Sequence, residues 1–114
     1  MGATVNYQHK SLAAGRWREL SFCEQMANVG AEVGRAINWR NKGKDDYAQN
    51  AFFRALELLD LTIGQAKGLC RLRELCRIRE LLVDYFYSPN EFNSSDLLWS
   101  KYFDPFNYAA RKDR

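Results

Sequence analysis

Apolar residues recur every three to four positions through four stretches of the chain, and this spacing is the strongest constraint on its fold. The stretches run from about Arg16 to Arg40, from Asp46 to about Gln65, from about Gly68 to Tyr87, and from Ser95 to Asp104. Each becomes amphipathic when residues advance by ~100° per position, as they do in an α-helix. We therefore predict four helices, the last of them short and aromatic-rich, with one further turn allowed after Pro105.

Short polar connections separate the four stretches. They are NKGKD, the region from Gly64 to Gly68, and SPNEFNSS, all rich in turn-forming residues. Short connections favour antiparallel neighbours, and no stretch alternates apolar and polar residues as a strand would. The expected fold is all-α, an up-and-down four-helix bundle. Because 114 residues suit one domain, we place it at residues 16–114, after a flexible N-terminal tail at residues 1–15.

Two of the expected helices have a clear core face. In the first helix a stripe of large apolar residues is bordered by small ones, including Gly30 and Gly34. A helical glycine costs about 1 kcal/mol relative to alanine, so this pair indicates the close approach of a neighbouring backbone, or else a kinked helix. The stripe contains Phe22, Met26, Val29, Val33 and Ile37. The expected core face of the third helix contains Leu69, Leu72, Leu75, Cys76, Leu82, Val83 and Phe86.

The second helix has apolar residues on two sides. Its main face contains Ala48, Ala51, Phe52, Ala55, Leu58, Leu59, Thr62 and Ile63, and Asp45 or Asp46 can cap its start. Phe53 and Leu61 fall on the opposite side. They are either scattered surface residues, which are common, or a second buried face that would require a homo-oligomer.

Aromatic residues concentrate near the end of the sequence. Leu98, Trp99, Tyr102 and Phe103 share one face of the fourth expected helix. We expect these rings to close the end of the bundle, while base stacking on them is a weaker alternative. Trp99 and Tyr102 join Phe53 and Leu61 as candidate interface residues for self-association.

Arg79 lies in the middle of the apolar arc of the third helix, between Leu75, Leu82 and Phe86. A guanidinium group in that position requires a partner, because an isolated buried charge is very costly. We expect a structural ion pair with Asp96, Asp104 or free carbonyl groups, because the acids of the first two helices, Asp60 among them, lie off their own core faces. The alternative is a cleft that receives an external anion. A snorkelling side chain is the third interpretation.

The other arginines of this helix follow its polar side. Arg73 and Arg77 lie on a predicted solvent stripe with Glu80 and Asp84. Residues 67–80 hold five cations (Lys67, Arg71, Arg73, Arg77, Arg79) and two acids (Glu74, Glu80), an excess equal to the net charge of +3 for the whole chain. Arg73, Arg77 and Arg79 are therefore the candidate ligand- or anion-binding residues. Arg40, Lys42 and Lys44 are interpreted as complementing helix dipoles.

The remaining composition bears on three questions: the state of the cysteines, the binding of a metal or cofactor, and the presence of a membrane or secretory segment. The three cysteines are expected to be free thiols in a cytoplasmic protein, and the only histidine, His9, lies in the N-terminal tail. Because no zinc-ligand spacing or phosphate-binding glycine loop occurs, we expect no metal and no cofactor. No apolar run approaches the ~20 residues of a membrane span, and no secretory signal is visible.

Two stretches, YAQNAFFRALELLDLTI and RIRELLVDYFY, resemble the HEPN family of helical domains (higher eukaryotes and prokaryotes nucleotide-binding). In its ribonuclease members, an arginine and a histidine four to six residues later meet at a dimer cleft and cut RNA without metal. Here Arg79 matches the arginine, but Asp84 stands at the histidine position and points about 140° away on one helix. Aspartate does not supply the proton transfer of an imidazole near neutral pH. The resemblance therefore implies a non-catalytic member that dimerises and binds RNA, a nucleotide or a protein.

The sequence thus predicts a small cytoplasmic helical interaction protein that forms a homodimer and is not an enzyme. The alternative is a bundle that binds RNA or a nucleotide without nuclease activity, and an enzyme with an unrecognised site is the third hypothesis. A protein partner fits the first hypothesis, and no membrane association is expected.

Overall fold

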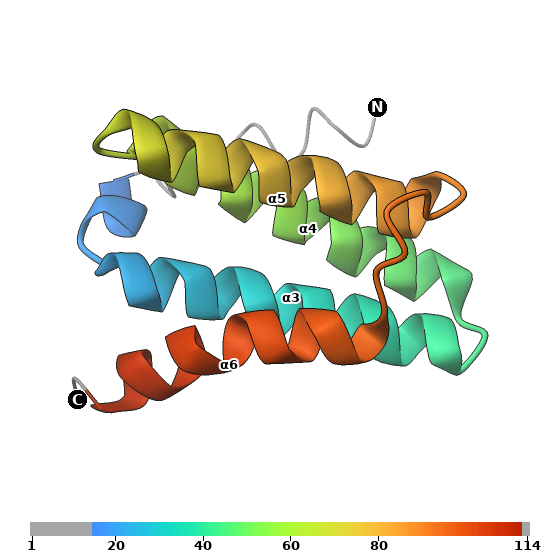
Figure 1. The fold of residues 1–114 in the computed structure, drawn as a ribbon. Helices are drawn as coiled ribbons and strands as arrows, with labels where there is room; N and C mark the ends of the chain where they lie inside the picture. Colours follow the sequence, from blue (N-terminus) through green and yellow to red (C-terminus); the bar gives the residue numbers. More distant parts are fainter. Residues whose placement is uncertain (1–14, 113–114) are drawn as a thin grey trace.

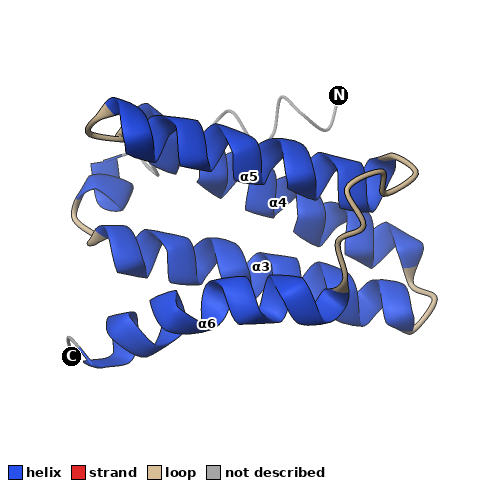
Figure 2. Cartoon of the chain, in the orientation of Figure 1, coloured by secondary structure: helices blue, strands red, loops and turns tan. Residues whose placement is uncertain are grey.

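The fold is a bundle of four long helices, and the computed structural model of the chain describes residues 15–112. The helices are α3 (Phe22–Asn41), α4 (Asp45–Gly64), α5 (Leu69–Tyr87) and α6 (Asp96–Lys112). Successive helices run in opposite directions (Figure 1), and only loops and turns join them within residues 15–112 (Figure 2). The predicted all-α bundle is confirmed. The predicted tail lies outside the described residues except for Gly15, which begins one helical turn at residues 15–18.

The first predicted helix is divided in the structure. The prediction of one continuous helix from about Arg16 is wrong, because α3 begins at Phe22 with Ser21 as the N-cap. The Ser21 hydroxyl accepts a hydrogen bond from the backbone N–H of Glu24 at 3.1 Å, and the Glu24 carboxylate accepts one from the backbone N–H of Ser21 at 2.8 Å. This reciprocal capping box satisfies two N–H groups at the helix start and separates α3 from the preceding turn.

The connection between α3 and α4 is a tight glycine turn. Gly43 has a φ of 76°, and its N–H donates to the Arg40 carbonyl at 3.0 Å. The N–H of Lys44 donates to the Trp39 carbonyl at 2.9 Å, which completes a Schellman motif that favours glycine at this position. The predicted aspartate cap of α4 is wrong, because Lys44 is the N-cap and makes no side-chain capping bond. Asp45 and Asp46 lie in the first turn, where their charges complement the helix dipole.

The fourth helix is longer than predicted. α6 has 17 residues and continues through Pro105 to Lys112, although proline lacks the N–H that would bond to the carbonyl four residues back. Residues beyond the proline still pack on the bundle, since Ala110 is buried and the Phe106 ring lies 5.8 Å from the Phe22 ring. These tertiary contacts stabilise a helix that the local sequence disfavours. Leu98, predicted to share one face with Trp99 and Phe103, is exposed whereas those two rings are buried.

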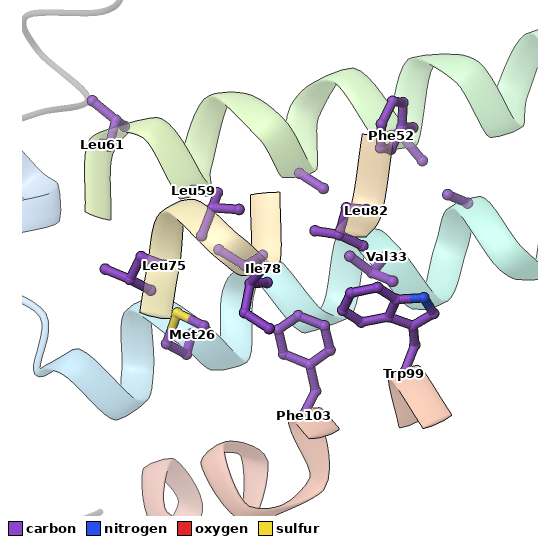
Figure 3. Packing of buried hydrophobic residues seen from close by; sticks show 14 of the residues in the cluster. Met26, Val33, Phe52, Leu59, Leu61, Leu75, Ile78, Leu82, Trp99 and Phe103 are labelled. Atoms are coloured by element: carbon purple, nitrogen blue, oxygen red, sulfur yellow. The ribbon is translucent and has the colours of Figure 1, made fainter. Parts of the chain in front are cut away.

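The core lies between the four helices, with α3 packed closely against both α4 and α6, and α5 packed on α4. Figure 3 shows side chains from all four helices converging there. The close approach predicted at Gly30 is made by the Phe103 ring rather than by a backbone. A Cβ atom at Gly30 would lie 2.7 Å from Cγ of Phe103, whereas one at Gly34 would meet nothing within 4 Å. Packing therefore explains Gly30 but not Gly34.

Candidate functional site

Arg79 forms an ion pair that joins α5 to α4. Its Nε lies 2.7 Å from Oδ1 of Asp60, and Nη2 donates to Oδ2 at 3.4 Å. The hydrogen bond to Asp60 raises the pKa of Arg79 above its ordinary value. The predicted ion pair is confirmed, but its partner is Asp60 rather than Asp96 or Asp104. The predicted burial is also wrong, because the two side chains remain 40% and 47% exposed. Arg79 therefore lies at the surface with a carboxylate partner.

Arg79 is exposed because α5 is rotated relative to the predicted orientation. The apolar residues that α5 buries are Leu75, Ile78 and Leu82. Leu69, Leu72 and Cys76, all predicted in the core, are exposed instead. The centre of the buried set is displaced by less than one residue step of ~100° on the helical wheel. Leucine occurs on both edges of the apolar arc, so the pattern alone did not determine which edge faces inward.

The exposed edge of α5 continues onto α4, and we call this surface the α4–α5 face. It surrounds the Arg79–Asp60 pair and contains Phe53, Leu69, Leu72, Cys76, Val83 and Tyr87. The rings of Phe53 and Tyr87 lie 5.9 Å apart, and the Tyr87 hydroxyl accepts a hydrogen bond from Gln49 at 2.6 Å. Phe53, Leu72 and Tyr87 are 43%, 36% and 53% exposed. The face is thus mainly apolar, with one charge of each sign paired at its centre.

Of the four predicted interface residues, only Phe53 lies on this face. Leu61 and Trp99 are buried in the core, and Tyr102 is partly buried with its hydroxyl donating to Glu74 at 3.2 Å. Burial raises the pKa of Tyr102 above its ordinary value. Leu61 is buried although it lies off the main stripe of α4, because the turn at residues 15–18 also packs there. Trp17 of that turn belongs to the same buried cluster and donates to the Thr62 hydroxyl at 2.9 Å.

Arg73 and Arg77 remain at the surface, as predicted for the solvent stripe. Both are exposed, and neither forms an ion pair with the residues that the structure describes. They lie on the same helix as Arg79, but they are beside the α4–α5 face rather than at its centre. These two guanidinium groups are therefore available to an external anion, whereas Arg79 is already neutralised.

Asp84 has a structural role that the sequence did not reveal. It was predicted on the solvent stripe, but only 6% of it is exposed. Its carboxylate accepts hydrogen bonds from the backbone N–H groups of Glu91 at 2.9 Å and Phe92 at 3.2 Å. Asp84 therefore holds the loop between α5 and α6 against the end of α5. The position that the HEPN resemblance assigns to histidine is thus occupied by a buried loop anchor.

A polar cluster at the same end of the bundle ties three helices together. Arg40 of α3 donates to the Tyr85 hydroxyl at 2.9 Å and to Asp96 at 2.8 Å, and Tyr85 donates to Asp96 as well. Burial, followed by the hydrogen bond to Asp96, raises the pKa of Tyr85. Burial alone would raise the pKa of Asp96, but hydrogen bonds from Tyr85 and Asn41 and the charge of Arg40 lower it. The predicted dipole role of Arg40 is therefore incomplete, because the residue also bridges α3, α5 and α6.

The described residues contain no group of three or more His, Cys, Asp and Glu side chains placed to hold a metal ion. None of the helices in residues 15–112 has the length and apolar character that crossing a membrane requires. Comparison of the chain with protein-family models, with curated proteins and with solved structures gave no significant match. The HEPN resemblance thus rests on the two sequence stretches, and function must be argued from the surfaces of the bundle itself.

Proposed function

We propose that this protein is a small, non-enzymatic helical interaction protein that self-associates as a homodimer through the α4–α5 face. The observation that carries the proposal is the exposed apolar edge of α5 beside Phe53. A stable monomer rarely leaves a continuous strip of leucine and aromatic side chains in water, and such strips are typical of protein interfaces. Other exposed apolar residues, such as Phe92, Leu98 and Tyr108, belong to the loop after α5 and to α6.

The spacing of the strip supports a helix as its partner. Leu69, Leu72, Cys76, Arg79 and Val83 follow one another at alternating intervals of three and four residues. This is the spacing of a two-helix coiled-coil seam, in which a single polar residue sets the register at some cost in stability. Arg79 occupies the polar position in this seam.

The charges on the face support a second copy of the chain as that partner. A two-fold symmetric interface brings the same patch of both subunits together, so the patch must be complementary to itself. The paired Arg79 and Asp60 give the centre of the face no net charge, and the flanking Leu72 and Tyr87 are uncharged. Two such faces meet without the repulsion that a patch of one charge sign would create.

Light scattering on the purified chain tests this proposal. We expect a molar mass near twice the 13.3 kDa of the chain at tens of micromolar. Phe53→Glu should lower the apparent mass toward the monomer, because it places an unpaired carboxylate in the interface. Leu98→Glu is the matched control, since Leu98 is 56% exposed on α6 and should leave the mass unchanged. A monomeric wild-type chain, or equal effects of the two substitutions, would contradict the proposal.

Cross-linking through native cysteines locates the symmetry axis. Cys76 lies near the middle of the α5 strip, whereas Cys70, also exposed, is one helical step of ~100° from Leu69 and so falls off the strip. If the axis passes near the middle of α5, mild oxidation should yield a covalent dimer that Cys76→Ser abolishes and Cys70→Ser does not. A disulfide requires Cα atoms within about 7 Å, so this result would fix the helix pairing closely. Dimers that form without this cross-link would place the axis elsewhere on the face.

Binding of RNA or a nucleotide, without nuclease activity, is the second candidate function, and the position of the cations favours it. Trp17 bonds to Thr62, and Gln25 bonds to both the Trp17 carbonyl and Gln65, so the turn at residues 15–18 lies beside the end of α4. That end of the bundle also carries the start of α5 and the last turn of α6 (Figure 1). These segments carry the cations Arg16, Arg18, Lys67, Arg71, Arg73, Arg111 and Lys112.

Titration of a fluorescent single-stranded RNA at several salt concentrations separates the two functions. Phosphate contacts make affinity fall steeply as salt rises, so the double substitution Arg73→Glu, Arg111→Glu should weaken binding strongly if this end binds RNA. No cleavage of the RNA is expected, since the described residues hold no histidine. If RNA binding is absent at low salt, or the double substitution has no effect on it, this second function is wrong and the dimer proposal stands alone.

A further inference from the structure

A groove follows the outer seam between α3 and α6, away from the α4–α5 face. Its main part has a volume of about 520 Å³ and is lined by residues of both helices, among them Gly34, Asn38, Leu97, Asp104 and Asn107. A second depression, lined by Glu24, Ala27, Asn28, Ala110 and Arg111, shares Asn107 with the first. The two depressions thus lie one after the other along the α3–α6 seam, with Asn107 between them, and we call them together the α3–α6 groove.

The length of the groove favours an elongated occupant. Its lining on α3 extends from Glu24 to Asn41, which at 1.5 Å per residue is about 26 Å. Small-molecule sites are usually compact clefts that surround their ligand on most sides. A helical segment of about 17 residues matches the length of this open groove, and helix-in-groove docking is a common mode of peptide recognition.

The floor of the groove is open where Gly34 lies. A Cβ atom at this position would meet nothing within 4 Å, so no neighbour within the described part of the chain accounts for a glycine there. Gly30, one turn earlier, is different because Phe103 fills the space above it. Small residues on a helix surface let the backbone of a second helix approach closely. Gly34 and Ala27 therefore form a shallow path that a docked helix can follow, with the 62% exposed Leu97 at its edge.

The charges of the groove determine which helix fits. Three carboxylates line it, those of Glu24, Asp96 and Asp104, against one cation, Arg111. Asp96 is already paired with Arg40, and Glu24 accepts the N–H of Ser21. Asp104 has no ion pair or side-chain hydrogen bond within residues 15–112, and neither have the side chains of Asn38 and Asn107. Within residues 15–112, Glu24 and Arg111 also lack an ion pair, so the groove carries two carboxylates against one cation, together with two free amides.

We propose that the α3–α6 groove binds a positively charged α-helical segment of a partner protein. Lysine or arginine side chains of that segment pair with Asp104, small residues of the segment lie over Gly34, and the amides of Asn38 and Asn107 bond to its polar edge. This inference is independent of self-association, because it uses a different seam of the bundle.

A helical peptide library tests the proposal. An 18-residue phage-displayed library, with alanine on one face and lysine, arginine, glutamate or glutamine permitted elsewhere, is selected on the wild-type chain. Two variants distinguish a loss of peptide binding in the groove from a general effect of replacing a helical glycine by leucine. Gly34→Leu fills the floor of the groove, and Gly64→Leu is the matched control, because Gly64 also lies in a helix with nothing within 4 Å of its Cβ position. Circular dichroism melts verify that both variants fold.

The expected result is a set of selected peptides rich in lysine and arginine. Their affinity, measured by fluorescence anisotropy, should fall at least tenfold for Gly34→Leu and for Asp104→Lys, and should stay within twofold for Gly64→Leu. Selection of acidic peptides, of no peptide, or of peptides that bind Gly34→Leu as well as the wild type would overturn the proposal. If Gly34→Leu fails to fold, Asp104→Lys alone decides, since Asp104 is exposed and makes no contact that the fold requires.

Discussion

Helices α3 and α5 are both amphipathic, but they bury different shares of their apolar residues. In α3 the stripe formed by Met26, Val29 and Val33 is fully buried. In α5 only part of an equally apolar arc is buried, and Leu69 and Leu72 lie in water. The cause is position in the bundle, because α3 packs closely against two helices and α5 against one. An interface should therefore be sought at the unburied edge of a peripheral helix such as α5.

The largest expected change in stability distinguishes a buried from an exposed leucine of α5. Leu82→Ala removes a side chain that is fully buried and should lower the free energy of unfolding by about 2–5 kcal/mol. Leu72→Ala, on the exposed edge, should lower that of the monomer by less than about 1 kcal/mol. Urea melts at low protein concentration measure both changes. Equal losses for the two leucines would mean that α5 is oriented as its sequence pattern first suggested.

Two glycine substitutions on α3 compare a position covered by α6 with one that is not. Gly30→Ala places a Cβ atom 2.7 Å from the Phe103 ring and should destabilise the fold by about 1–3 kcal/mol through overpacking. Gly34→Ala has free space and should stabilise the helix by up to about 1 kcal/mol, because alanine favours helix more than glycine does. Thermal melts of the two variants should therefore shift in opposite directions. Shifts of the same sign would contradict the tight packing of α6 on α3 at Gly30.

The polar cluster of Arg40, Tyr85 and Asp96 makes folding stability depend on pH, and the pKa of Asp96 sets the direction of that dependence. The pKa of Asp96 is lower in the folded chain than the ordinary value of about 3.9. Its contribution to stability is therefore complete above that value and is lost as the pH falls through the lower folded-state pKa. Because Asp96 is partly exposed, the contribution should be about 1 kcal/mol or less. Asp96→Asn should lower stability at pH 7 and converge with the wild type near pH 2 in urea melts.

The smallest expected effects concern the arginines of α5. An exposed ion pair contributes about 0.2–1 kcal/mol, so Arg79→Met should cost no more than that in the monomer. Arg73→Ala and Arg77→Ala, which lack partners within residues 15–112, should each change stability by less than about 0.5 kcal/mol. A loss of about 3 kcal/mol or more for Arg79→Met would indicate a buried charge pair. In that event, the α4–α5 face would be covered in solution.

Local sequence was enough to predict the helices and most of their ends. The 3.6-residue spacing identified all four long helices, and turn-forming residues placed the breaks near Gly43, Gly68 and Pro89, because backbone conformation responds to the residues immediately around it. The centre of the apolar stripe of α3 was also correct, since Met26, Val29 and Val33 are buried and Phe22 and Ile37 at its ends are partly buried. The ion pair of Arg79 was predicted from a burial that the structure does not show, since its side chain is 40% exposed.

Only the tertiary structure decided which edge of α5 faces inward and which residues meet across helices. The partner of Arg79 is Asp60, 19 residues away, and the carboxylate of Asp84 binds a loop that folds back over it. The continuation of α6 past Pro105 depends on the contact of Phe106 with Phe22, far earlier in the chain. Helix periodicity defines an apolar arc but not the number or direction of its neighbours. The neighbours determine what is buried, and so they also determine which surface is left free to bind.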